Sequence, residues 1–242
     1  MLDRAVASQK QGEQPHLHRE LKALVEEGIV TDLLRLLLAD RDLLSQVANA
    51  SHTHYNHFDK IMLISSVDPE YYLRLHIWWP DDSKAADENI HDHKSEFSSV
   101  LLKGEYQFEE FLPVEEGNDF YEYKYLTRRG LNNYSMPFVG MTKLSCVFSG
   151  TLRAGNCYTL SPHVLHRVVN NPRELTASLM LQRHPVKSFA RVMTEEPLVE
   201  QTDIDASPLT PEYLAEAIEK FLAHVEGRDA TREGELQQVG AS

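Results

Sequence analysis

The chain opens with two stretches in which apolar residues recur at helical spacing. After a polar segment over residues 1–14, leucines repeat every three to four positions from Leu17 to Leu24, and Gly28 is placed to end that helix. The stretch TDLLRLLLADRDLLSQVAN carries a dense leucine face and predicts one further helix. We therefore expect a disordered N-terminus followed by a helical extension over residues 15–58.

The pattern changes over residues 59–196. Short runs rich in β-branched and aromatic residues, such as KIMLISS, YYLRLHIWW and TASLMLQRH, alternate with turn clusters such as PDDSKAADEN and VEEGND. About eight such runs, without intervening helical patterns, are typical of a β-sandwich or barrel. Because the flanking helices are too few to form a second core, this pattern predicts a single mainly β domain.

The C-terminal part returns to helical spacing. A polar linker leads into TPEYLAEAIEKFLAHVEG, where Thr210 can cap, Pro211 suits the first turn and Gly227 suits the end. We expect the linker and helix to occupy residues 197–227. The composition of residues 228–242 predicts a disordered tail.

Composition narrows the functional classes. The net charge is −13, with 37 acidic and 24 basic side chains, which disfavours a nucleic-acid surface because binding to phosphates needs a basic face. It also disfavours anionic membranes, and no apolar run approaches the ~20 residues that span a bilayer. Two cysteines provide no disulfide framework. We expect a cytoplasmic protein with neither a nucleic-acid nor a membrane partner.

Pairs of histidines separated by one residue are candidate metal ligands. Since the chain has 12 histidines in 242 residues, a pair of this kind is expected by chance. There are three pairs: His16/His18, His52/His54 and His91/His93. The first lies in a predicted helix, where positions i and i+2 diverge. The second, joined by His57, forms either a metal site or a turn whose imidazoles cap backbone groups or line a pocket mouth.

The third pair has a more favourable context. A strand is expected at His91 and His93, and side chains two apart on a strand share a face. Gly104 follows in a predicted strand-turn-strand, and far downstream His166 starts another expected strand. Three histidines on two strands could converge on one ion and leave coordination positions open for catalysis.

These residues form a pattern that resembles a known family. A His-x-His pair, a glycine about a dozen residues later, and then G-x(6)-P-x(3)-H-x(3)-N over residues 155–170 are similar to the two-part motif of the cupin superfamily. Within it, IHDHKSEFSSVLLKGEYQFEEF and LHRVVNNPRELTASLMLQRHP resemble the cysteine dioxygenase (thiol dioxygenase) group. The resemblance covers about half of the chain.

The resemblance implies a cupin double-stranded β-helix, or jelly-roll barrel, flanked by α-helices at both termini. It implies that His91, His93 and His166 bind one metal inside the barrel. Imidazole ligands suit Fe, Zn, Cu and Ni; Fe(II) is the expected metal, with Zn, Ni or Mn as alternatives. The competing interpretation is a metal-free cupin in which these histidines belong to the core.

The sequence departs from this family at several positions. The acid that cupins often supply after His-x-His corresponds to Glu96, which comes slightly too early; it is a candidate fourth ligand, a partner that orients a ligand, or a rim residue. The Ser-x-His-x-Tyr run of the thiol dioxygenases is represented by Ser178, Met180 and Gln182. No cysteine lies near Phe97, and no arginine lies in DKIMLIS. These differences argue against cysteine as the substrate.

Other residues are candidates to replace the missing groups. In YYLRLHIWW, strand alternation places Arg74 and His76 on one polar-aromatic face. If that face points inward, Arg74 can bind a carboxylate with two hydrogen bonds; the alternative places it in solvent, with Arg74 in an ion pair. Gln182 and Lys60 are further pocket candidates.

The sequence thus predicts a mononuclear non-heme Fe(II) oxygenase that oxidises a small polar or carboxylate-bearing metabolite with O₂. Arg74, His76 and Gln182 are its candidate catalytic residues. The alternatives are a metal-dependent isomerase, lyase or hydrolase that does not use O₂, and a non-enzymatic ligand-binding cupin. The expected partners are the substrate and O₂, with a homodimer as the candidate assembly.

Overall fold

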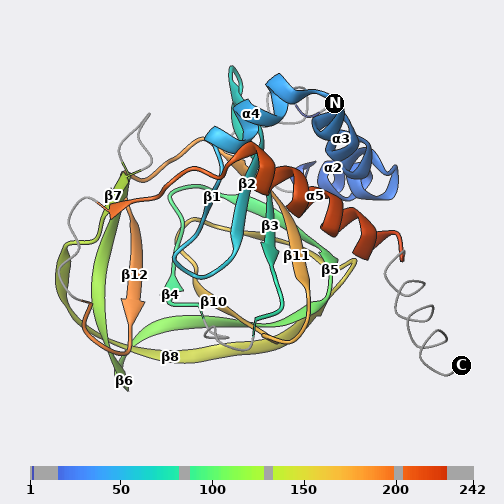
Figure 1. The fold of residues 1–242 in the computed structure, drawn as a ribbon. Helices are drawn as coiled ribbons and strands as arrows, with labels where there is room; N and C mark the ends of the chain where they lie inside the picture. Colours follow the sequence, from blue (N-terminus) through green and yellow to red (C-terminus); the bar gives the residue numbers. More distant parts are fainter. Residues whose placement is uncertain (1, 3–15, 82–87, 128–132, 199–203, 228–242) are drawn as a thin grey trace, which may run out of the picture.

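A computed structural model describes residues 2, 16–81, 88–127, 133–198 and 204–227 of the chain (Figure 1). The segments expected to be disordered, residues 1–14 and 228–242, lie outside this range except for Leu2. The described helices are α2 (His16–Glu26), α3 (Ile29–Ala39), α4 (Arg41–Asn49) and α5 (Pro211–Val225). None of the described helices is long and apolar enough to cross a bilayer.

The stretch predicted as one second helix is in fact two helices, α3 and α4. Asp40 separates them with an extended backbone, at φ −118° and ψ 101°. Its carboxylate accepts hydrogen bonds from the backbone N–H groups of Asp42 and Leu43. Such an N-cap satisfies donors that a new helix leaves free, so the chain turns here although its leucine pattern continues.

The remaining described elements are strands. They are β1 (His52–Thr53), β2 (Asp59–Val67), β3 (Glu70–Trp78), β4 (Ile90–His91), β5 (Phe97–Lys103), β6 (Glu105–Thr127), β7 (Asn133–Ser135), β8 (Phe138–Arg153), β9 (Cys157–Leu160), β10 (Leu165–Asn170), β11 (Thr176–Arg183), β12 (Ala190–Thr194) and β13 (Ile204–Asp205). All their pairings are antiparallel.

Most of these strands form two facing sheets. One sheet has the order β1-β2-β3-β11-β5-β9. In the other, β10 and β12 each pair with both β4 and β6, and β6 also pairs with β8. Strands that alternate between two sheets in this order make a jelly roll, the double-stranded β-helix of cupins. The predicted fold is confirmed.

One predicted turn does not divide its strand. The cluster VEEGND was expected to separate two strands, but β6 runs continuously through it. Pro113 and Asn118 both lie opposite Leu144 of β8, so the four residues between them form an outward bulge. A bulge accommodates extra residues without ending the ladder, which explains why turn-forming residues lie within a strand.

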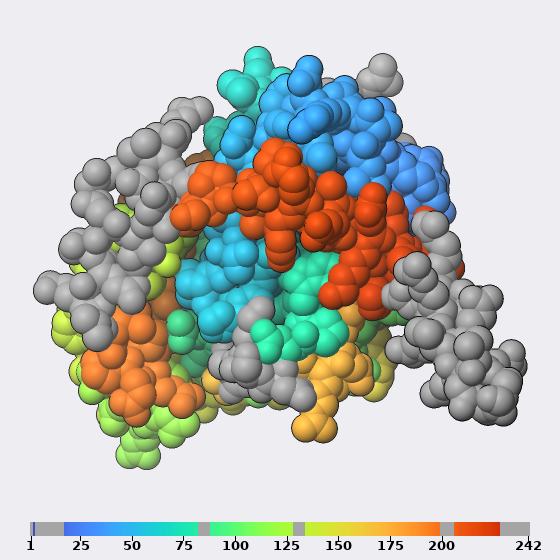
Figure 2. All heavy atoms as spheres, in the orientation of Figure 1, coloured from blue at the N-terminus to red at the C-terminus, as the bar shows by residue number. Residues whose placement is uncertain are grey.

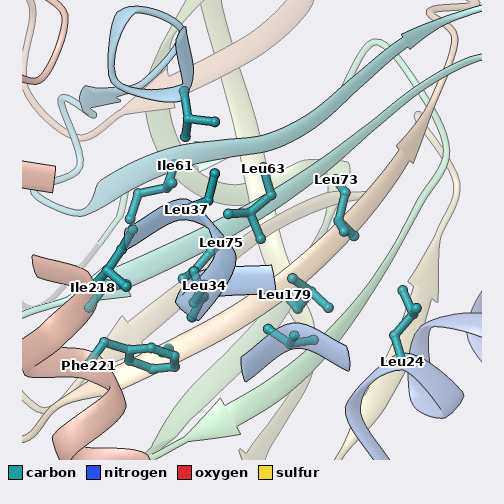
Figure 3. Close-up of a cluster of buried hydrophobic side chains, with 14 of the residues drawn as sticks. Leu24, Leu34, Leu37, Ile61, Leu63, Leu73, Leu75, Leu179, Ile218 and Phe221 are labelled. Carbon is teal, nitrogen blue, oxygen red and sulfur yellow. The ribbon is translucent and has the colours of Figure 1, made fainter. Parts of the chain in front are cut away.

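The helices lie against the outer face of the first sheet. Figure 3 shows side chains from both layers meeting in one cluster, including Leu34 of α3, Leu75 of β3 and Phe221 of α5. All three are at most 1% exposed. Because burial of apolar area is the main favourable term in folding, the helices and this sheet share one core.

Helix α5 completes this layer. As predicted, Thr210 caps it, accepting a hydrogen bond from the Tyr213 N–H at 3.1 Å, and Pro211 occupies the first turn. The helix contacts α3 and α4. Figure 2 shows this segment in red-orange as a band beside the blue N-terminal helices. The C-terminal helix therefore fastens the N-terminal helices to the barrel.

Strand β3 connects the helical layer to the barrel interior. Its Leu73, Leu75 and Ile77 are at most 2% exposed and belong to the core shared with the helices. The alternate residues Arg74 and His76 point into a cavity between the two sheets. The predicted two-faced alternation is confirmed, and the polar-aromatic face is the inner one rather than the solvent-facing one.

Gly104 is expected to tolerate no side chain. It links β5 to β6 with φ +73°, and a Cβ atom there would lie 2.5 Å from the Leu175 carbonyl oxygen. Gly104→Ala should destabilise the fold by at least about 2 kcal/mol, because a left-handed backbone and overpacking add their costs. Urea unfolding measures this loss.

Gly155 provides the matched control for that substitution. It also has positive φ, at +88°, but a Cβ atom there would meet nothing within 4 Å. Gly155→Ala should therefore cost only the backbone contribution of about 1–2 kcal/mol. Equal losses at the two glycines would contradict the close approach of Leu175 to Gly104.

Candidate metal centre

Three histidines from the two predicted motifs come together inside the barrel. One nitrogen from each of His91, His93 and His166 lies within 4.8 Å of the others. Strand β10 pairs with β4 so that His166 lies directly opposite His91. Among the described residues this is the only group of three or more His, Cys, Asp or Glu side chains that converges in this way. It is the predicted trio.

The hydrogen bonds of the trio suit metal binding. Nδ1 of His91 lies 2.8 Å from the Asn89 carbonyl oxygen, and Nδ1 of His166 lies 3.2 Å from that of Val164. A proton donated from Nδ1 to a carbonyl leaves Nε2 with its lone pair, which is the form that coordinates a metal. Nε2 of His93 is buried without a hydrogen-bond partner, so an ion here would satisfy it.

Burial also keeps these imidazoles neutral. It lowers the pKa of His91 and His93, and it lowers the pKa of His166 to about 3. Metal ligation requires the neutral imidazole because a protonated ring offers no lone pair. The residues present therefore fit a divalent transition metal, with imidazole ligands suited to Fe, Zn, Cu or Ni.

The backbone conformation that brings the three histidines together differs from the predicted one. The sequence placed His91 and His93 on one strand face, but β4 ends at His91 and His93 lies in the following bend. The intervening Asp92 holds that bend. Its side chain is fully buried and accepts hydrogen bonds from the Arg191 backbone N–H and Nε, both at 2.8 Å. The Lys187 ammonium adds an ion pair at 2.7 Å.

Glu96 is not brought into the trio. Its carboxylate lies 3.9 Å from Arg183 Nη1, and its side chain is 24% exposed. Of the three roles considered from its spacing, this position corresponds to the rim rather than to the ligand group. The early spacing after His93 explains this, because Glu96 precedes the first residue of β5 and the strand that follows turns inward only from Phe97.

The trio lies in a cavity of about 210 Å³ between the two sheets. The candidate residues Arg74, His76 and Gln182 line it as well, together with Lys60. The Arg74 guanidinium donates a hydrogen bond to the Gln182 amide oxygen and lies 5.1 Å from the Tyr72 ring centre. All the polar candidates singled out along β3 and β11 therefore share one cavity with the trio.

Positive charge gathers on one part of this cavity. No described carboxylate forms an ion pair with Arg74 or Lys60. Burial lowers the pKa of Arg74 to about 10, and burial together with nearby Arg74 lowers the pKa of Lys60 well below its usual value. Buried cations without a counter-ion are costly, so an anion entering this region would be stabilised.

His76 contributes an orphaned nitrogen to the same region. It is 7% exposed, and its Nε2 is buried without a hydrogen-bond partner. Burial, followed by the charges of Lys60 and Arg74, lowers the pKa of its imidazole well below the usual value. The neutral ring can therefore donate or accept a hydrogen bond toward a ligand in the cavity.

The positions that correspond to the thiol dioxygenase run also face the cavity. Ser178, Met180 and Gln182 of β11 all line it. The Gln182 amide oxygen accepts a hydrogen bond from Arg74, so this side chain is held within the cavity.

The second histidine cluster forms a turn rather than a metal group. His54 lines the cavity, its ring centre lies 4.6 Å from that of Phe58, and its Nδ1 accepts a hydrogen bond from the Asn56 N–H. His57 is exposed, with φ 63°. Of the two alternatives, the structure corresponds to the turn that caps backbone groups and lines the pocket.

Two functional positions escaped the sequence interpretation. Asp92 was not singled out in the sequence, and its ion pairs with Lys187 and Arg191 are seen only in the structure. Glu88 lay in a polar turn cluster, yet it is 8% exposed and lines the cavity. Its only signal in the sequence is its position two residues before the buried Ile90 of β4.

Comparisons with known proteins give only distant likenesses. No family model and no curated protein matches the sequence. An uncharacterised double-stranded β-helix protein of Klebsiella pneumoniae has 11% identity and a TM-score of 0.34, with 58% of this chain and 88% of that chain covered. The hydroquinone 1,2-dioxygenase of Sphingomonas sp. has 10% identity and a TM-score of 0.32, with 55% and 67% covered.

The DMSP lyase DddQ of Ruegeria pomeroyi has 14% identity and a TM-score of 0.32, with 55% of this chain and 50% of that chain covered. The present chain therefore spans half the length of that lyase. Likenesses at this level assign neither a family nor an activity. The fold rests on the strand order described above, and the function is argued from the residues in the cavity.

Proposed function

We propose that this protein is a mononuclear non-heme Fe(II) oxygenase that oxidises a small metabolite bearing a carboxylate or similar anionic group. The observation that carries the proposal is the position of His91, His93 and His166 in one cavity with Arg74 and Lys60, for which the described residues supply no counter-ion. Three neutral ligands leave coordination positions open, as catalytic metal sites require.

The roles of the protein groups follow from their positions. His91, His93 and His166 would hold the ion, which when bound supplies electron transfer to O₂ and a Lewis acid beside the substrate. Arg74 and Lys60 bind the anionic group of the substrate and so orient it toward the trio. The Phe97 ring, centred 4.4 Å from that of His93, excludes water from the metal side.

Oxygen uptake by the metal-loaded protein tests the proposal. The protein is purified without chelator, analysed for metal, and loaded with Fe(II) under anaerobic conditions. A panel of small carboxylates and amino acids is then screened in an oxygen electrode. We expect uptake that requires both Fe(II) and a panel member, and that is absent from chelated protein.

Two outcomes would contradict the oxygenase. Conversion of a panel member at the same rate without O₂ indicates a metal-dependent lyase, isomerase or hydrolase instead. Protein that retains no metal, and whose stability is unchanged when His91 and His93 are replaced by alanine, indicates a ligand-binding module.

Arg74 should contribute strongly to anion binding. A hydrogen bond to a charged group is worth about 1.5–3 kcal/mol, so Arg74→Ala should weaken the binding of a small dicarboxylate such as succinate by about 10- to 150-fold. Isothermal titration calorimetry measures this. Arg153→Ala is the control, since Arg153 is exposed and pairs with Glu105. Unchanged succinate affinity in Arg74→Ala would exclude Arg74 from substrate binding.

A further inference from the structure

A buried carboxyl group, that of Glu88, lies in the same cavity as the basic side chains of Arg74 and Lys60. This residue precedes β4, is 8% exposed and lines the cavity together with the metal trio. Its backbone N–H donates a hydrogen bond to the Val168 carbonyl oxygen at 3.1 Å, which fixes the segment against β10. No described lysine, arginine or histidine forms an ion pair with its carboxylate.

The surroundings of Glu88 favour a cationic partner. Burial raises its pKa to about 8, and the neighbouring Val168 backbone and Trp78 side chain offset only part of that shift. An ionised carboxylate inside a protein is costly unless it is paired. A positive group placed beside Glu88 would remove that cost.

Aromatic rings from three strands line the same cavity as this carboxylate. They belong to Trp78 of β3, Tyr106 of β6 and Tyr158 of β9. The centres of the Trp78 and Tyr106 rings are 6.2 Å apart, and the Tyr106 and Tyr158 hydroxyl oxygens lie 2.9 Å apart. Burial raises the pKa values of both tyrosine hydroxyls, and the Glu88 carboxylate adds to the shift. Aromatic faces with a carboxylate are the composition of sites that bind organic ammonium groups.

Arg74 lies at a distance from these rings. Arg74 and Trp78 both point inward from β3 and are four residues apart, which corresponds to about 13 Å along a strand. Lys60 of β2 lies opposite His76, between these two positions. The cavity therefore has a positive part and a negative part.

We propose that the substrate is a zwitterion, whose organic ammonium group lies against Glu88 and the rings of Trp78 and Tyr106 while its anionic group faces Arg74 and Lys60. This inference rests on the proposed function, because it names the substrate class of the same cavity. It assigns Glu88 the role of selecting substrates that carry an amine.

Matched ligands test this assignment without knowledge of the natural substrate. The ligands are 4-aminobutanoate, 5-aminopentanoate and 6-aminohexanoate, each compared by calorimetry with the carboxylate of the same length that lacks the amine. In the wild-type protein at least one amino acid should bind about 10- to 100-fold more tightly than its partner, as expected for a charge-assisted hydrogen bond in a buried site.

Glu88→Gln should abolish that preference. The variant keeps the size of the side chain and removes its charge, so it should bind the carboxylates with unchanged affinity and the amino acids no better. Its metal content and thermal unfolding are compared with those of the wild type. The ligand preference of the wild-type protein is a second measurement that does not depend on any variant folding.

Several results would overturn the inference. Equal binding of amino acids and matched carboxylates by the wild type would do so, as would no saturable binding of either set, or a preference that survives in Glu88→Gln. These readouts are separate from turnover. Selective binding of the amino acids without O₂ uptake would refute only the oxygenase, and O₂ uptake with amine-free carboxylates at equal affinity would refute only the zwitterion.

Discussion

His166→Ala is expected to abolish metal binding. The substitution removes the one ligand that comes from β10, so the ion would no longer be held from two strands. Loss of a group that merely orients a ligand weakens metal affinity by about 10- to 100-fold, so loss of a ligand itself should cost more. Metal analysis after loading should give close to one equivalent in the wild type and almost none in the variant.

Stability provides a second readout of the same change. A ligand that binds only the folded state stabilises it by about 4 kcal/mol at 1,000 times its dissociation constant, so added metal should raise the Tm of the wild type and leave that of His166→Ala unchanged. His184→Ala is the control because that histidine is exposed and outside the trio. His166→Gln, which keeps more of the ring volume, guards against a simple packing defect. Equal metal content in all four proteins would refute the site.

Asp92→Ala is expected to cause the largest loss of stability. The buried carboxylate compensates two cations, Arg191 and Lys187, whose side chains are 28% and 16% exposed. Removing one partner of a buried ion pair costs about 3–5 kcal/mol because the remaining charges stay uncompensated. Urea unfolding of the metal-free protein measures the loss directly.

The same substitution should also loosen the metal site. Asp92 lies between His91 and His93, and its bonds to Arg191 fix the bend that turns His93 toward the trio. Metal affinity should therefore fall in Asp92→Ala even though every ligand is present. Asp119→Ala is the matched control: its carboxylate is 62% exposed and pairs with Lys143, so it should cost no more than about 1 kcal/mol. Equal stability of the two variants would contradict a buried role for Asp92.

The inward face of β3 was predictable because it depends on strand alternation, and the metal trio was predictable because its members lie in short local motifs. A period of two places Arg74 and His76 on the same side whatever the rest of the fold does. His166 was reached through its spacing from Gly155 and Pro162, a local pattern. Features encoded by local spacing can be deduced from one sequence.

Features that depend on distant partners could not be deduced in this way. Glu88 shares the cavity with Trp78 and Tyr106 and is hydrogen-bonded through its backbone to Val168, on three different strands, and nothing near it in sequence indicates this. The position of Glu96 is likewise decided by Arg183, 87 residues away. Long-range pairing sets the charge pattern of the cavity, and only the three-dimensional arrangement shows it.

The leucine pattern continues through Asp40, and for that reason it did not predict the break between α3 and α4. Both helices bury leucines against the same sheet, so their hydrophobic periods run on across the break. The capping signal was present in the sequence as an aspartate two residues before another. The hydrophobic period indicated which residues are buried, whereas the Asp40 cap determines where α4 begins.

The two faces of β3 separate substrate choice from the integrity of the scaffold. Odd-numbered positions such as Leu75 pack in the core shared with the helices, whereas even-numbered positions such as Arg74 and Trp78 face the cavity and the other side chains that line it. Exchanges at the even positions can therefore change which molecule is accepted without disturbing the shared core. The strand is a natural place for laboratory evolution of new specificities, with the odd positions held constant in the library.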